Sequence, residues 1–195
     1  MAKPMMRLSA GVIAVAAFAA GSSINALLPD REAILTETFP VSGRVGEPVQ
    51  IRTGTVTVDD VATARTVTRF GLTAQTSAVY LTFTLTYVPN GQEAAVAPVE
   101  VVGGNGAVFG GAQPFGGVLA CGGSQADLPI SCPMAIEVGE EALAGAHVRV
   151  YNYSSASGDD VADIDLALNA EEAAELLHSA GTFDVTEPHY GGRPR

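Results

Sequence analysis

Residues 79–88, with the sequence VYLTFTLTYV, constrain the fold of this chain more than any other stretch. Large apolar residues alternate there with threonines, and the apolar set is Val79, Leu81, Phe83, Leu85 and Tyr87. A period of two is typical of a β-strand with one face in a core and the other in water. β-Branched and aromatic residues dominate the segment, and Pro89, Asn90 and Gly91 supply turn residues at its end. We therefore predict a central strand with buried odd-numbered side chains.

Further alternating segments predict an all-β domain. They lie at residues 39–49, 49–52, 55–58, 64–70, 96–102, 134–138, 146–150 and 164–168, with turn residues between them. This amounts to roughly seven to nine strands, the pattern of a β-sandwich or barrel. The segments at 49–52 and 55–58 form either one long strand or two strands with a bulge at Gly54, and Asp59 and Asp60 end this part. Pro98 favours an edge position for the strand at 96–102.

One short helix is predicted near residues 170–180. Asn169 is a suitable N-cap, and Glu171 and Glu172 are favourable at the positive end of the helix dipole. Gly181 ends the run. A helix of about ten residues is unstable alone, so we expect it to pack on the sandwich.

The N-terminus carries an apolar segment. Residues 8–28 contain no charge, follow Lys3 and Arg7, and are long enough to cross a bilayer as a helix. An Ala-Phe-Ala motif would allow signal peptidase to cut before Ala20, which would give a secreted protein. The apolar run continues to Leu28, which favours an uncleaved anchor. The basic residues before it predict that the rest of the chain lies outside the cell membrane.

Charge limits the partners of the exported part. Two of the ten basic residues precede the apolar segment, which leaves eight against 21 acidic residues beyond it, a net charge of −13. Such a domain is a poor partner for nucleic acid or for an anionic membrane surface. We predict a signal-anchor at residues 1–29, a linker at 30–38, the β-sandwich with a last strand near Phe183 at 39–187, and a flexible tail at 188–195.

The chain resembles the exported immunoglobulin-like domains of unknown function that Gram-positive, actinobacteria-like bacteria carry behind a signal or anchor. The likeness lies in GEPV at 46–49 leading into TVTV at 55–58, in the strand at 79–88, and in AIEV at 135–138 followed by EALAGA at 141–146. It covers roughly residues 40–168. The resemblance implies an immunoglobulin-like β-sandwich and carries no catalytic residues.

Cys121 and Cys132 are the only cysteines. An even number in an exported chain favours a disulfide. The alternative makes Cys132 a nucleophile with His147 as base and Arg149 as oxyanion partner, as in the sortases, which are also anchored β proteins. Sortases place the histidine before the cysteine and have a Thr-Leu-x-Thr-Cys motif, and this chain has neither feature.

Other candidate sites are weaker. Asp159, Asp160, Asp163 and Asp165 could bind Ca²⁺, but their spacing does not match an EF-hand loop, and a solvated surface is the simpler interpretation. Three histidines are scattered without metal-ligand spacing. The glycine-rich residues 103–117, with Phe109 and Phe115 as core contacts, lack the Lys-Ser/Thr ending of a phosphate-binding loop.

These observations favour a noncatalytic, membrane-anchored extracytoplasmic interaction or cell-envelope accessory domain with an envelope or membrane protein as its partner. We expect no catalytic residue, no cofactor and no metal site. The alternatives are a cysteine-dependent, sortase-like envelope enzyme and a module that binds calcium or another small ligand.

Overall fold

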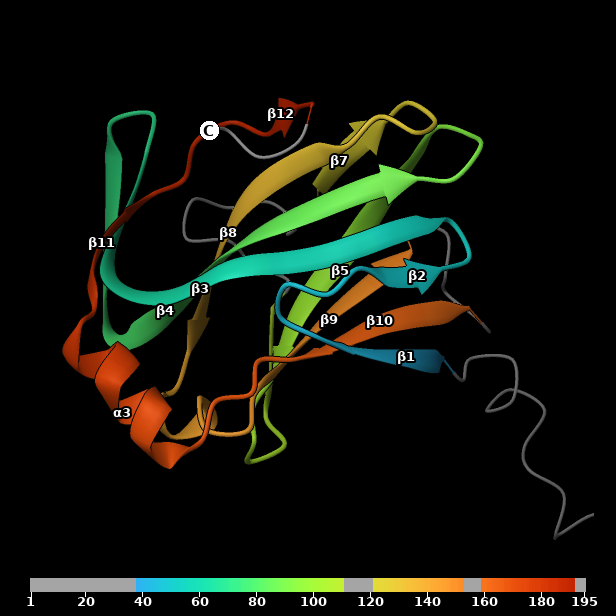
Figure 1. The fold of residues 1–195 in the computed structure, drawn as a ribbon. Coiled ribbons are helices and arrows are strands. Elements are labelled where there is room, and N and C mark those ends of the chain that lie inside the picture. Colours follow the sequence, from blue (N-terminus) through green and yellow to red (C-terminus); the bar gives the residue numbers. More distant parts are fainter. Residues whose placement is uncertain (1–37, 111–120, 153–158, 192–195) are drawn as a thin grey trace, which may run out of the picture. The chain divides into compact units, whose positions relative to one another are not determined.

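The longest elements are two antiparallel strands, β3 (Gly54–Arg69) and β4 (Leu72–Pro89). The computed structural model describes residues 38–110, 121–152 and 159–191 (Figure 1). The alternation at 79–88 is realised in β4: Val79, Leu81, Phe83, Leu85 and Tyr87 are fully buried. The predicted central strand and its register are confirmed.

The strands form two sheets. The β4 sheet has the order β11 (Gly181–Asp184), β3, β4, β8 (Ile130–Val138) and β12 (His189–Tyr190), with β2 (Val49–Ile51) also paired to β3. The β9 sheet has the order β1 (Phe39–Arg44), β10 (Asp160–Asp165), β9 (His147–Asn152), β5 (Ala94–Val102) and β6 (Val108–Gly110), with β7 (Cys121–Ser124) also paired to β5. The described residues thus contain more strands than predicted, because several pieces of two to four residues also pair.

One hydrophobic core joins the two sheets. Phe83 and Ile136 of the β4 sheet belong to the same buried cluster as Val99, Val148 and Ile164 of the β9 sheet. This arrangement confirms an all-β fold with two sheets packed through their apolar faces.

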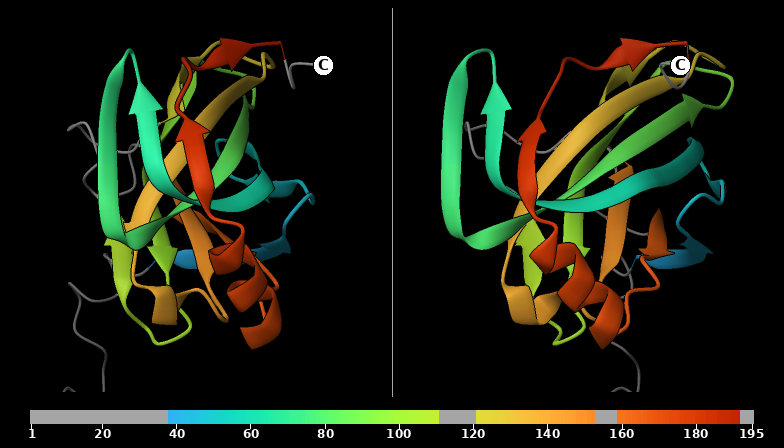
Figure 2. Two further views of the ribbon diagram at one scale, coloured as in Figure 1. Left: turned by 90° about the vertical axis from the view of Figure 1, so that its left-hand side faces the viewer. Right: turned by 60° about the vertical axis from the view of Figure 1, so that its left-hand side comes forward.

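The outer face of the β4 sheet has a smaller core. Val67, Tyr80 and Ala135 are buried there, and Phe183 and Val185 pack against them. Strand β11 pairs in parallel with β3, and helix α3 (Ala170–His178) precedes it in the chain (Figure 2). The alternation in β4 predicts that this outer face is exposed to solvent. The C-terminal segment covers it instead.

Helix α3 confirms the predicted helix. The Asn169 side chain accepts from the backbone N–H groups of Glu171 and Glu172, and the Glu172 carboxylate accepts from the Asn169 N–H, which completes a capping box. Thr63 of β3 donates its hydroxyl to the Leu176 carbonyl at 2.5 Å, which ties the helix to the sheet.

A wide bulge bends the β3–β4 hairpin. Ala64 pairs with Tyr80, whereas Thr66 already pairs with Gln75, so four residues of β4 oppose Arg65. The Arg65 guanidinium donates to the carbonyls of Ser77 and Ala78 and pairs with Glu140 in the short helix η1 (Glu140–Ala142). Beyond the bulge the hairpin turns away from the sandwich (Figure 1).

Four predictions about elements are corrected. Residues 49–51 and 54 onward form two strands, as one of the two alternatives predicts, but β2 and β3 are joined by a hairpin turn and not by a bulge at Gly54. Asp59 and Asp60 do not end a strand, because Asp60 adopts φ 54° within an irregular part of β3 and the ladder resumes at Ala62.

Strand β5 lies inside the β9 sheet rather than at an edge. It tolerates Pro98 because the register with β9 shifts between Val96 and Val99, where a missing N–H breaks no ladder bond. The predicted tail contains β12, since His189 pairs with Ser131 and Tyr190 with Ile130.

The predicted anchor at residues 8–28, the possible cleavage before Ala20, the linker up to residue 37 and Phe115 lie outside the described residues. Within residues 38–110, 121–152 and 159–191, no helix is both long enough and apolar enough to cross a membrane.

Candidate functional site

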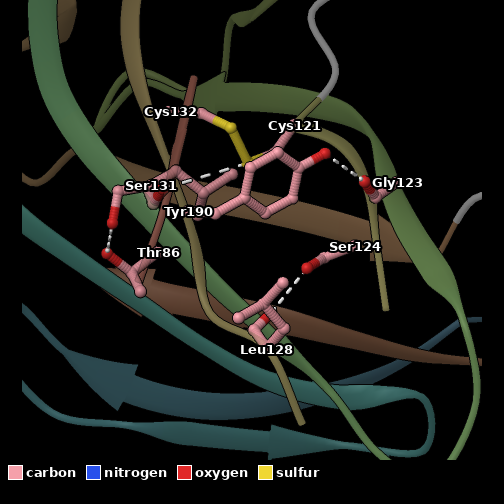
Figure 3. The surroundings of a disulfide bond; sticks show 9 residues. Thr86, Cys121, Gly123, Ser124, Leu128, Ser131, Cys132 and Tyr190 are labelled. Carbon is pink, nitrogen blue, oxygen red and sulfur yellow. Dashed lines mark hydrogen bonds between the residues drawn. A yellow bond between two sulfur atoms is a disulfide. The ribbon is translucent and has the colours of Figure 1, made fainter. Parts of the chain in front are cut away.

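The disulfide lies at one end of the sandwich and joins its two sheets. Cys121 on β7 is bonded to Cys132 on β8, with 5.6 Å between their Cα atoms (Figure 3). Both residues are buried. The predicted disulfide is confirmed, and the bond leaves no Cys132 thiolate for the nucleophile of the sortase-like alternative.

Hydrogen bonds hold the turn between the two cysteines. The Ser124 hydroxyl donates to the Leu128 carbonyl at 2.5 Å, and the Asp127 N–H donates to the Pro89 carbonyl at 2.9 Å. Tyr190 of β12 donates its phenol hydroxyl to the Gly123 carbonyl at 3.1 Å (Figure 3). The surface beside the disulfide is therefore preformed.

This surface contains a cavity of about 490 Å³. Its lining residues are Glu93, Gly123, Gln125, Leu128 and Tyr190. We call it the Tyr190 pocket. Leu128 and Tyr190 supply apolar walls that remain 36% and 58% exposed, and Glu93 supplies a carboxylate. A cavity of this size with one charged group suits an apolar side chain accompanied by a cation.

The turn of the β3–β4 hairpin is a second apolar surface. Phe70 and Leu72 are 71% and 62% exposed, and the Arg69 guanidinium carbon lies 5.3 Å from the centre of the Phe70 ring. A cation over an aromatic face at this distance is attracted to it. We call Arg69, Phe70 and Leu72 the hairpin tip.

The hairpin tip and the Tyr190 pocket lie at the same end of the sandwich. The β3–β4 turn, β7 and β12 point to one end in Figure 1 and in both views of Figure 2. Among the described residues, six large hydrophobic side chains are exposed, and Phe70, Leu72, Leu128 and Tyr190 belong to this end. Phe39 and Val108 are the other two.

The acidic cluster at 159–165 is divided between two ion-paired networks. Asp159 is buried and accepts from Arg52 Nε at 2.7 Å and from Asn152 Nδ2 at 2.8 Å. The hydrogen bond from Arg52 contributes most to lowering the pKa of Asp159 from 3.8 to about 2. This pair links the turn after β2 to the start of β10, so it joins the two sheets.

Asp163 belongs to the second network, on the outer face of the β9 sheet. Its carboxylate lies 3.3 Å from His147 Nδ1 and 3.3 Å from the Arg149 guanidinium. A cavity of about 390 Å³ beside it is lined by Ser42, Gly43, Arg44, Glu47, His147, Asp163 and Asp165. His147 and Arg149 thus face an aspartate on their own sheet, and the structure does not bring them together with Cys132.

Within the described residues, no three His, Cys, Asp or Glu side chains lie close enough together to hold a metal ion. His178 ends helix α3 and His189 lies on β12, so the histidines are separated as their spacing indicated.

The alternation of residues 64–70 predicts only a separate short strand, so the sequence pattern does not predict the hairpin tip. The signal was the pair Phe70-Gly71 between two alternating segments. Phe70 and Gly71 adopt φ 50° and 79°, the left-handed pair of a two-residue hairpin turn. Phenylalanine is not favoured in the left-handed backbone conformation, so the backbone alone gives no reason for its presence in this turn.

Comparison of the chain with protein-family models, with curated proteins and with solved structures finds no match.

Proposed function

We propose that this chain is a noncatalytic, membrane-anchored interaction domain of the cell envelope that binds another protein through the hairpin tip and the Tyr190 pocket. The apolar segment at residues 8–28 is the anchor, the domain faces outward, and its topology is of the immunoglobulin-like class. The observation that carries the proposal is the gathering of exposed Phe70, Leu72, Leu128 and Tyr190 at one end. Exposed aromatic side chains beside a preformed pocket are typical of protein interfaces.

The test compares Phe70→Ser with Phe39→Ser in the full-length chain in its native membrane. Both residues are exposed phenylalanines, but Phe39 lies on β1. After brief cross-linking, Phe70→Ser should lose the proteins captured by the wild type, and Phe39→Ser should retain them. Equal capture by the two variants would contradict the proposed binding surface.

The anchor has its own test. The mass of the purified native protein should include residues 1–29, and an added protease should digest the domain in intact cells after removal of the wall. An N-terminus near Ala20 would show a secreted protein instead.

A further inference from the structure

We infer that the partner of this surface is a second copy of the same chain, with the hairpin tip of each copy seated in the Tyr190 pocket of the other. This inference rests on the proposed function and identifies its partner.

The tip offers exposed apolar side chains, and the pocket offers a cavity with apolar walls that could receive one. The tip presents an aromatic and an aliphatic side chain, and the pocket presents a cavity of about 490 Å³ with Leu128 and Tyr190 in its wall. Leu128 and Tyr190 are fixed by hydrogen bonds of their own segments, so little ordering is needed when a side chain enters.

Their charges are complementary. Arg69 keeps its guanidinium over the Phe70 ring, so a positive charge accompanies the tip, and Glu93 supplies a negative charge in the pocket. The part of the chain beyond the apolar segment carries a net charge of −13, so two copies repel each other at long range. A contact between copies is therefore favoured where a cation of one meets a carboxylate of the other.

None of the three tip residues lines the pocket of its own chain. Thr66, Val67 and Thr68 pair on one side with β4 and on the other side with Thr182, Phe183 and Asp184 of β11. This three-stranded arrangement holds the turn in place.

The shared location determines the symmetry. Since the tip and the pocket lie at one end, two copies related by a two-fold axis can meet end to end and form two identical contacts at once. Such a pair is closed and leaves neither surface exposed. Two aromatic anchors bury only a few hundred Å² between them, so the association is weak and depends on concentration.

The experiment uses two full-length copies with different C-terminal tags, expressed together in the native membrane and cross-linked briefly. Phe70→Ser disables the tip, and Leu128→Glu disables the pocket by placing a carboxylate among its apolar walls. Both side chains are on the surface, and unchanged thermal melts of the variants confirm that they fold.

The arrangement of the two substitutions is the decisive variable. With both in one copy and a wild-type partner, both contacts are lost, and co-capture should fall roughly tenfold. With Phe70→Ser in one copy and Leu128→Glu in the other, one contact remains intact, and co-capture should fall much less. Phe39→Ser in both copies should leave co-capture at the wild-type level.

Equal co-capture in the two arrangements would overturn the reciprocal contact, and so would an absence of co-capture between wild-type copies. If wild-type copies do not associate but Phe70→Ser still abolishes the capture of another protein, only the second-copy partner is wrong and the proposed function stands. If no captured protein depends on Phe70, both fail.

Discussion

At the scale of single residues, adjacent side chains of β4 differ in how deeply they are buried. Phe83 is fully buried in the core between the sheets, whereas Thr84 is half-buried beside Asp59 and Pro133 on the outer face. The strand alternation alone predicts this difference.

Phe83→Ala should lower the free energy of unfolding by roughly 3 to 5 kcal/mol, because it removes a large buried ring and leaves a cavity. Thr84→Ala should lower it by less than about 1 kcal/mol. Denaturant melts of the two variants measure both values. Similar losses would show that the register or the burial is wrong.

The Arg52–Asp159 pair predicts a specific acid dependence. The pKa of Asp159 is about 2 in the folded protein and 3.8 as an ordinary value. Its folded pKa is depressed, so the stabilisation is present above about pH 4 and is lost as the pH falls toward 2.

Asp159→Asn should therefore destabilise the protein at pH 7, and its deficit relative to the wild type should shrink between about pH 4 and pH 2. Glu187→Gln is the matched control, because it also replaces a carboxylate by an amide but at an exposed position. Denaturant melts over this pH range measure the effect. A deficit that stays constant down to pH 2 would contradict an ionised Asp159 as its source.

At the scale of elements, local sequence positions helix α3, and contacts with the sheet stabilise it. The helix has nine residues, too few to be stable alone. The capping box at Asn169 satisfies its first N–H groups, while Ala173 is buried and Leu177 packs against the core.

Asn169→Ala should reduce stability by about 1 kcal/mol because it removes the acceptor for two backbone N–H groups. Asn169→Ser retains a capping oxygen and should lose only a few tenths of a kcal/mol. Thermal melts compare the two variants, and hydrogen exchange at Glu171 and Glu172 should quicken only in Asn169→Ala. An equal loss in both would assign the effect to something other than the cap.

At the scale of the whole molecule, one covalent link and one ionic link join the two sheets, and the partners are 11 residues apart in the first and 107 apart in the second. The disulfide joins β7 to β8, and Arg52 joins the turn after β2 to Asp159 before β10. These links act in addition to the shared core, whose apolar side chains come from both sheets.

Cys121→Ser and Cys132→Ser should lower stability by similar amounts of about 2 to 3 kcal/mol, because either change removes the same loop constraint. The native protein should show no free thiol under denaturing, nonreducing conditions. An alkylatable Cys132, or a Cys132→Ser variant that keeps full stability while Cys121→Ser does not, would revive the cysteine-dependent enzyme.

The sequence by itself determined the features that depend on near neighbours. The two-residue period of β4, the N-cap of α3 and the pairing of two cysteines in a short loop follow from local geometry and from the small number of possible partners. For the same reason it predicted the sandwich class and the buried side of β4.

Only the tertiary structure decided the features that depend on distant segments. Tyr80 is buried although the alternation of β4 predicts that it faces water, because it belongs to a cluster against which Phe183 and Val185 of the C-terminal segment pack. Pro98 lies inside a sheet because a bulge accommodates it, and Tyr190 lines the same pocket as Leu128 because β12 pairs with β8. These contacts join residues far apart along the chain, and a local period carries no information about which distant segment will pack against it.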